Sequence, residues 1–585
     1  MLLPPPLFKS FDSVALGQDF ETPTYKMGLP TRIPIYPRAT QHRRPEMMAT
    51  RLHGISGRRF AQAATKNFLL LQLLFLGLFS YMFGALFQQT ERIHNLTVGF
   101  VDYDVGGAIG SAVRRAYTGS FHERENFPTL IERSVSDFPS PEDLESAVCR
   151  TDYWAALYVL PGASGRLSSA LSQGEKEGNY DRQSVMAFIW NQARYPTVVD
   201  SAIAVNLATL SNAARLAYTN NNSDVASLFA NNSVSQSTIS ILANPWDLVP
   251  HNIQPTTQGP RAIYNTVALI LIMMQEFFYL GIVNGLHQSF GVYTKLRPSR
   301  IVLFRTLNSV AYCLAGSLCV AGAIWAFRAG WDVSGAQFVL TWLTLWLFAH
   351  LNFQTLDVFT VWLPHPYVPM ALVAWVVLNV ASVIVPFELS AAWYRVGYAM
   401  PAHGAYQVLV DVWSRGCNPR LQYSLPVMFA WEVAASVGAI LGVYRRSHYA
   451  ALAEELAQKQ LEERVDAAVE LERRGTHARG GESGARRGEE RVEGDDGGDD
   501  KAKFEDVRRG GANVADVERV SSCPSSGSGS DDGDVERQRR QELSNAITHE
   551  DEQMQLEQRR ASRACPSFGP AFSLPFGEQG DDDRN

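Results

Sequence analysis

The apolar residues of this chain are grouped into one isolated run, a long polar stretch and then a close series of further runs. The first run, Phe68 to Phe87, carries no charged side chain. As a helix it is long enough to cross a hydrocarbon core of about 30 Å. The polar stretch from Gln88 to Pro260 is too long for a loop and has the size of a domain. The pattern therefore predicts a membrane protein in which one helix and one inserted domain precede a helical bundle.

Five further apolar runs after Pro260 predict five more spans, and thus about six in all. They are Ala262 to Val283, Val302 to Phe327, Gln337 to Phe353, Tyr367 to Pro386 and Leu425 to Val443. His350 and Asn352 interrupt the end of the fourth of the six spans, so we expect a loop from Gln354 to Pro366. An even number of spans places both termini on the same side of the membrane.

Basic residues flank the spans and predict which side faces the cytosol. They form three clusters, namely Arg51, Arg58, Arg59 and Lys66 before the first span, Lys295, Arg297 and Arg300 between the second and third, and Arg445 and Arg446 after the last. One topology makes all three clusters cytosolic, with both termini inside and the domain between Gln88 and Pro260 outside. The loop from Gln354 to Pro366 contains neither Lys nor Arg, so the rule gives no information there.

The three glycosylation sequons agree with this orientation, because a sequon matters only on the lumenal or extracellular side. They begin at Asn95, Asn221 and Asn231, and all lie between Gln88 and Pro260, a stretch that is less than a third of the sequence. Asn95 follows the first span closely, so we expect Asn221 and Asn231 to be the better acceptors.

Two of the six cysteines, Cys149 and Cys417, fall in segments placed outside the cytosol. A disulfide between them and two unpaired thiols both fit the sequence. His403 has no partners at ligand spacing, and we expect no metal and no cofactor.

The segment between the first two spans has the pattern of a small extracytoplasmic α/β domain. Thr97 to Asp102 and Tyr153 to Leu160 are predicted strands, and helices are predicted after Ser140 and from Gly165 to about Gln173. The stretch from Asp181 to Tyr218 is predicted to be a long helix or a helix pair.

Polar residues within the predicted spans are the candidate functional residues. Glu276 lies inside the second span together with Asn265 and Gln275, Arg305 begins the third span, and Glu432 lies in the outer half of the last. One interpretation is that these polar residues line a water-containing path used for transport. For Glu276 and Glu432 the alternative is structural hydrogen bonding, and for Arg305 it is a side chain that reaches the cytosolic interface. Pairing of Arg305 with Glu276 is conceivable, since both lie toward the cytosolic half.

The two ends of the chain differ in composition from the middle. Residues 1–66 are rich in Pro and Arg, and residues 475–585 are rich in Gly, Arg, Asp and Ser, so both are predicted to be disordered and cytosolic. Between the last span and the tail, residues 445–474 are predicted to form a cytosolic helix. The net charge of -7 does not indicate nucleic-acid binding.

Three segments resemble a known family. They are VGFVDYDVGGAIG (Val98 to Gly110), YWAALYVLPGAS (Tyr153 to Ser164) and NVASVIVPFELSAAWYRVGYAMPAHGAYQ (Asn379 to Gln407), and together with the first span they resemble the fungal nitrosoguanidine-resistance membrane proteins. The resemblance covers about Asn67 to Tyr449. It implies a multispanning plasma-membrane protein linked to tolerance of toxic compounds and to lipid organisation. The plan of spans is also similar to the membrane domain of type-2 ABC exporters.

Two functional hypotheses follow. The first is a permease-like protein that moves or helps exclude hydrophobic compounds or lipids; the sequence contains no G-x-x-x-x-G-K-[ST] loop, so it does not predict an ATPase. The second is a non-transporting scaffold or regulator that binds partners through the external domain and the tail. Expected partners are membrane lipids, a hydrophobic small molecule, and a second copy or a regulatory protein. No catalytic arrangement is evident, so we do not expect an enzyme.

Overall fold

The computed structural model describes residues 57–173, 180–221, 236–256, 259–485, 537–551 and 553. The chain divides into two compact units, residues 1–73 and residues 74–585. Helix α1 (Gly57–Leu86) starts in the first unit, and the sheet and the other helices belong to the second.

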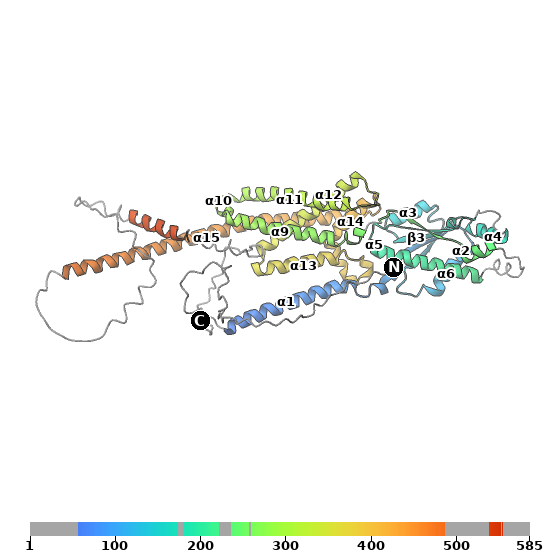
Figure 1. The fold of residues 1–585 in the computed structure, drawn as a ribbon, viewed down its shortest axis with the longest axis horizontal. Helices are drawn as coiled ribbons and strands as arrows, with labels where there is room; N and C mark the ends of the chain where they lie inside the picture. Colours follow the sequence, from blue (N-terminus) through green and yellow to red (C-terminus); the bar gives the residue numbers. More distant parts are fainter. Residues whose placement is uncertain are drawn as a thin grey trace, which may run out of the picture. The chain divides into compact units, whose positions relative to one another are not determined.

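A five-stranded mixed sheet forms the core of the domain between the first two membrane helices (Figure 1). Its strands are β1 (Thr97–Asp102), β2 (Thr129–Arg133), β3 (Ala155–Val159), β4 (Met186–Trp190) and β5 (Leu248–Asn252), in the order β2-β1-β3-β4-β5. The β3–β4 pair is antiparallel, and the other three neighbouring pairs are parallel.

Helices cover both faces of the sheet, because successive strand side chains point to opposite sides. Phe100 and Leu157 pack on the face covered by α2 (Ala108–Ser120), α4 (Ala163–Gln173) and α6 (Val205–Asn221). Val101 and Ile189 pack on the other face, against Leu144 and Val148 of α3 (Pro141–Cys149). Helix α3 begins at a capping box between Ser140 and Asp143. Short elements complete the domain, namely η2 (Thr90–Asn95), η3 (Arg182–Ser184), α5 (Pro196–Val198), the π-helical η4 (Val199–Ala204), α8 (Gln236–Ala243) and η5 (Gly259–Ile263).

The two predicted strands and the helix after Ser140 are confirmed, but the prediction for Asp181 to Tyr218 is wrong in its first part. Residues Met186 to Trp190 form β4, hydrogen-bonded between β3 and β5, and after the single 3-10 turn η3 the first α-helix of this stretch begins only at Pro196. A short apolar run that is buried on both faces has no helical or alternating period, so its sequence does not distinguish strand from helix.

Five helices of the described chain are long and apolar enough to cross a membrane. The candidate spans are Ala61–Leu86 of α1, α9 (Val267–Ser289), α11 (Pro298–Ala326), α12 (Gly335–Trp362) and Leu421–Leu471 of α15 (Leu421–Ala485). The fifth predicted span, Tyr367 to Pro386, contains only the 14-residue helix α13 (Val368–Ala381). At 1.5 Å per residue this helix is about 21 Å long, which is shorter than a hydrocarbon core. The described chain thus has five candidate spans by length and composition, and the predicted count of six is not confirmed.

The expected loop from Gln354 to Pro366 is wrong, because α12 continues to Trp362. The polar residues His350 and Asn352 do not end the helix; both are buried inside the protein. The remaining connection to α13 holds only the turn η6 (His365–Tyr367). A polar residue is tolerated within an apolar span when it faces other helices rather than lipid, as both residues do here.

The segment between α13 and α15 connects the bundle to the sheet domain. It contains η7 (Phe387–Leu389), η8 (Ala392–Ala399) and α14 (Pro401–Trp413), and α14 is buried almost throughout its length. A disulfide joins Cys149 at the end of α3 to Cys417 just after α14, with the Cα atoms 4.2 Å apart. The Tyr195 backbone N–H donates to the Tyr406 hydroxyl at 2.9 Å. These contacts fix the sheet domain to the helical bundle.

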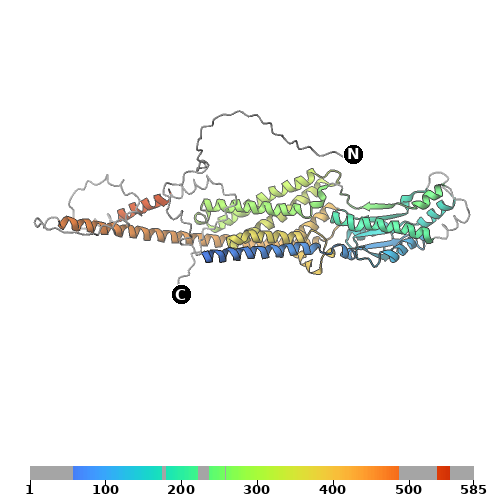
Figure 2. The same ribbon diagram turned by 60° about the horizontal axis from the view of Figure 1, so that its bottom comes forward.

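The last membrane helix extends far beyond its apolar part (Figure 2). Helix α15 is continuous from Leu421 to Ala485, so the predicted helix at 445–474 is an extension of the last span. Residues 57–66 and 475–485 belong to α1 and α15, and residues 537–551 are also helical, which corrects the prediction of disorder at these positions. Arg464 pairs with Asp551 at 2.8 Å. The other residues of the predicted disordered ends lie outside the described residues.

Leu157→Ala tests the core of the sheet domain. Leu157 is fully buried in the central strand β3, so its truncation removes apolar contacts and leaves a cavity. We expect a loss of about 2–5 kcal/mol of stability, seen as a lower melting temperature of the full-length protein in detergent. Val105→Ala is the control, because Val105 is 82% exposed and should leave the melting temperature nearly unchanged. Equal melting of both variants would contradict the buried sheet.

Cysteine labelling tests the disulfide between Cys149 and Cys417. We expect denatured, unreduced protein to bind two fewer maleimide groups than the same protein after reduction. A Cys149→Ser/Cys417→Ser variant should show no such difference, because the bonded pair is absent. Equal labelling of the wild type before and after reduction would show that both thiols are free.

Candidate functional site

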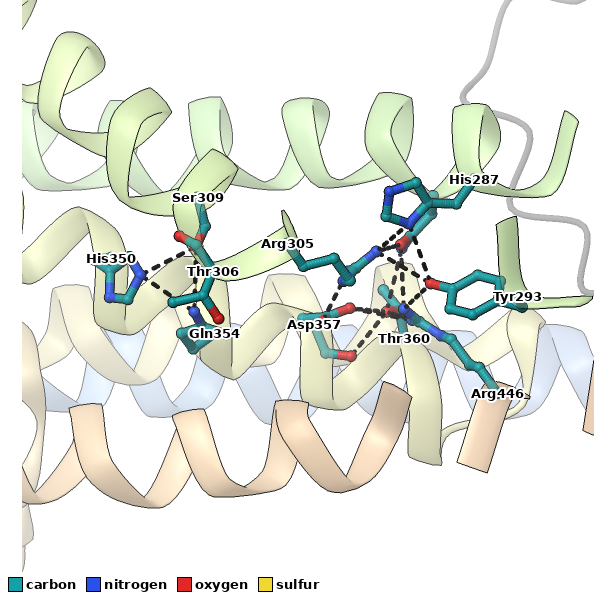
Figure 3. Close-up of polar contacts among 11 residues, drawn as sticks. His287, Tyr293, Arg305, Thr306, Ser309, His350, Gln354, Asp357, Thr360 and Arg446 are labelled. Carbon is teal, nitrogen blue, oxygen red and sulfur yellow. Dashed lines mark hydrogen bonds and ion pairs between the residues drawn. The ribbon is translucent and has the colours of Figure 1, made fainter. Parts of the chain in front are cut away.

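An ion cluster lies inside the bundle where α11, α12 and α15 meet (Figure 3). Asp357 of α12 holds Arg305 of α11 at 2.8 Å through one carboxylate oxygen and Arg446 of α15 at 3.1 Å through the other. The Asp357 side chain is 2% exposed, and the arginine side chains are 6% and 10% exposed. We call these three residues the arginine cluster. It carries two positive charges and one negative charge.

Neighbouring polar groups satisfy much of the arginine cluster's hydrogen-bonding capacity. Arg305 donates to Asn284 at 3.0 Å and to the Tyr293 hydroxyl at 3.2 Å, and it lies 3.0 Å from His287 Nδ1. Arg446 donates to the same Asn284 and Tyr293 side chains, each at 3.2 Å, and to Thr360 Oγ1 at 2.6 Å. Removing the charged groups of Arg305, Arg446 and Asp357 from water costs free energy, and these hydrogen bonds offset part of that cost. They also connect α9 and α10 (Val292–Lys295) to the cluster.

A second cluster of polar side chains surrounds His350, which lies on α12 seven residues before Asp357. His350 Nδ1 is 2.7 Å from Glu432 Oε1, and His350 Nε2 is 3.1 Å from Ser309 Oγ and 3.2 Å from Gln354 Nε2. Ser436 also donates to Glu432 Oε1, at 3.2 Å. An amide nitrogen only donates, so His350 Nε2 is assigned as the acceptor and Nδ1–H as the donor to Glu432. We call these five residues the histidine cluster.

A cavity of about 90 Å³ connects the two clusters. Its polar lining comes from both, namely Arg305 and Asp357 of the arginine cluster and Gln354 and Ser436 of the histidine cluster, with Thr306 between them. Its apolar lining is Val302, Phe353, Ala439, Ile440 and Val443. A cavity of this size has room for several water molecules, and the polar part of its lining offers them hydrogen-bond partners. The interior of the bundle therefore contains a row of polar side chains with a cavity beside it.

Arg305 and Glu276 do not pair with each other, contrary to the arrangement considered from the sequence. Arg305 is buried against Asp357 and so does not reach out to the interface. Glu276 is 1% exposed and accepts a hydrogen bond from Cys313 Sγ at 3.2 Å through Oε2. Its other oxygen, Oε1, is buried and has no hydrogen-bond partner among the described residues.

The remaining intramembrane candidates lie outside the two clusters. Asn265 donates to the backbone oxygen of Val383 at 2.8 Å and so connects the start of α9 to the chain just after α13. The side chain of Gln275 packs against Gly316 of α11, where a Cβ atom would collide with it. Both contacts are those of residues that hold helices together.

The sequence interpretation missed the centre of the site, Asp357, because it placed this residue in a loop. It also treated Arg446 only as a topology signal and used His350 only to mark the end of a span. One sequence signal was present: His350, Gln354 and Asp357 recur at the spacing of one helical face. The absence of Gly or Pro between Gly335 and Pro364 also allows a helix through this region.

The three sequons differ in what the structure describes of them. Asn95 ends η2 and is exposed, and its Nδ2 donates to the Glu388 backbone oxygen at 3.0 Å. Asn221 is the last residue of α6, and Asn231 lies outside the described residues.

A buried arginine also occupies the junction between the sheet domain and the segment before α15. Arg194 is 5% exposed, and its guanidinium lies 3.5 Å from the centroid of the Trp154 ring. Burial, with a smaller contribution from the nearby Arg420, lowers the pKa of Arg194 to about 10. The guanidinium nevertheless stays charged at neutral pH, so a cation–π contact holds a full charge at this junction.

Apolar spans around a buried ion cluster and a polar cavity define a multi-pass membrane protein with a polar interior. The chain belongs to the family described as "Protein of unknown function (DUF3533)", whose model matches residues 67–437. It is also similar to an uncharacterized endoplasmic reticulum membrane protein of Saccharomyces cerevisiae, with 21% identity over 266 residues. This match covers 44% of the chain and 52% of the yeast protein, so the chain spans about half the length of that relative. No solved structure matches the chain.

Asp357→Asn tests the arginine cluster. Removing the carboxylate leaves two buried arginines without their counter-ion, so we expect a loss of about 3–5 kcal/mol and a lower melting temperature in detergent. Asp332→Asn is the matched control, because Asp332 pairs with Arg415 at 2.6 Å on the surface and should have almost no effect. If the two variants melt alike, the buried cluster does not stabilise the bundle.

Proposed function

We propose that this protein is a permease-like membrane protein that moves hydrophobic toxic compounds or lipids, or helps to exclude them, and so contributes to tolerance. The single observation that carries the proposal is the cavity between the arginine and histidine clusters. Buried charges are costly within a membrane, and those that line a cavity are typical of substrate and ion pathways. The resemblance to nitrosoguanidine-resistance proteins supports the same class of function. The proposal includes no ATPase and no catalytic step.

Under this proposal the sheet domain is extracytoplasmic and both termini are cytosolic. The Cys149–Cys417 disulfide supports this orientation, because disulfides persist in oxidising compartments. The resemblance implies the plasma membrane, whereas the name of the yeast relative refers to the endoplasmic reticulum. A fluorescent fusion would distinguish the two membranes, and glycosidase sensitivity of Asn221 and Asn231 variants would report the orientation.

A scaffold or regulator is the second candidate, and contacts of the α15 extension favour it. Arg464 and Asp466 of this extension pair with Asp551 and Arg540, at 2.8 Å and 2.6 Å. These pairs bring a segment distant in sequence onto the helix, and under this second proposal the two together form the surface that a protein partner binds. The pairs are exposed, so each contributes little stability by itself.

One complementation experiment separates the two candidates. A strain that lacks the protein receives the wild type, Ala439→Leu, or a form without residues 475–585, and tolerance and efflux of a hydrophobic toxic compound are measured. A permease predicts several-fold lower efflux for Ala439→Leu, since Ala439 lines the cavity and the larger side chain fills part of it, and full activity without the tail. Loss of tolerance only in the tail-less form supports the scaffold. Equal rescue by the wild type and Ala439→Leu removes the cavity from the mechanism.

A further inference from the structure

The positive and negative charges inside the bundle do not balance when His287 and His350, the histidines at the two clusters, are neutral. Three carboxyl groups, Glu276, Asp357 and Glu432, lie among the membrane helices together with two guanidinium groups, Arg305 and Arg446. Three negative and two positive charges leave a net charge of -1. An uncompensated charge at membrane depth is costly, and binding one proton removes it.

Two orphaned oxygen atoms show where this imbalance is located. Glu432 Oε2 and Glu276 Oε1 are both buried and lack hydrogen-bond partners among the described residues. Both oxygens of Asp357, in contrast, face arginines. A buried carboxylate oxygen without a partner is unfavourable, and a proton or a water molecule relieves it. The extra proton therefore belongs near Glu276 or Glu432, away from the arginine cluster.

The cavity favours Glu432 over Glu276. Gln354 and Ser436 line the cavity, and each also contacts the pair formed by His350 and Glu432. Glu276 is not among the cavity-lining residues, and its described hydrogen bond comes from Cys313. A water molecule in the cavity would therefore be separated from the His350–Glu432 pair only by the side chains of Gln354 and Ser436.

We infer that His350 and Glu432 form a proton-binding site that is loaded from the cavity, and that proton movement is the energy source of the proposed permease. One proton from cavity water changes the pair from a net charge of -1, imidazole with carboxylate, to a net charge of zero. The same proton leaves to water when the pair gains access to the other side of the membrane. This coupling rests on the proposed function, whereas the binding of the proton does not.

Titratable and charged groups on every helix that packs against α12 define the setting of this pair. Apart from tyrosines, they are Glu276 and His287 on α9, Arg300, Arg305, Cys313 and Cys319 on α11, His403 and Asp411 on α14, and Glu432, Arg445, Arg446 and His448 among residues 421–448 of α15, while α13 has none. Arg305 and Arg446 are held by Asp357, and His403 contacts the Ser382 backbone oxygen and the Tyr423 hydroxyl. Of the carboxyl groups among them, Glu432 is the one bonded to a histidine.

Infrared difference spectra of the full-length protein in lipid nanodiscs, recorded during a pH step, test proton binding without any substrate. We expect the wild type to show a carboxyl or imidazole change equivalent to about one proton per chain. Glu432→Gln should lose it, and Glu463→Gln, on the exposed extension of α15, should keep it. His350→Gln should lose it or shift its midpoint, which provides a second test if Glu432→Gln does not fold. An unchanged spectrum in the variants overturns the inference.

An efflux measurement distinguishes failure of the proton-coupling inference from failure of the proposed permease function. Efflux of the toxic compound is measured in cells with and without a protonophore, for the wild type and Glu432→Gln. Efflux that stops with the protonophore and in Glu432→Gln supports proton coupling. Proton binding without any efflux supports the site and rejects the permease. Efflux that persists both with the protonophore and in Glu432→Gln supports the permease and rejects the coupling.

Discussion

Asp357 holds two arginines from two other helices, and the packing of the membrane bundle depends on this contact. Lipid tails are as apolar as the helix surfaces, so the hydrophobic effect does not draw the spans together as it does in water. Polar contacts and close packing have to do so instead. Asp357 joins α12 to α11 and α15, and the hydrogen bonds of Asn284 and Tyr293 add α9 and α10. The same contacts that hold the bundle together also line its cavity.

The junction with the sheet domain connects the row of polar side chains in the bundle to the domain between the first two spans. The disulfide of Cys149 with Cys417 and the Tyr195–Tyr406 hydrogen bond fix that domain to α14 and the chain that follows it. Helix α14 in turn packs against α12 and α15, which carry His350 and Glu432. The sheet domain is thus in contact, through α14, with the two helices that carry the proposed proton site.

Part of the site was readable from the sequence, because a charged residue in an apolar run is rare enough to be noticed. Glu276, Arg305 and Glu432 were identified in this way, and the structure buries the first two and pairs the third with a histidine. Their partners were not readable, since His350 and Asp357 are 82 and 52 residues distant along the chain from the groups they bind. The pair of Arg305 with Glu276, which the sequence left conceivable, does not form, because the carboxylate that holds Arg305 belongs to Asp357 of α12.

The sequence by itself determined the membrane class, the inserted domain and the strands with a clear pattern, because length, apolarity and turn residues act locally. Tertiary structure decided the rest. Met186 to Trp190 form a strand because they pair with β3 and β5. Helix α12 continues past His350 and Asn352, and α13 has only 14 residues, so it is shorter than a hydrocarbon core. In each case the outcome depends on which neighbour a residue faces. Such neighbours come from distant parts of the chain, and only folding brings them together.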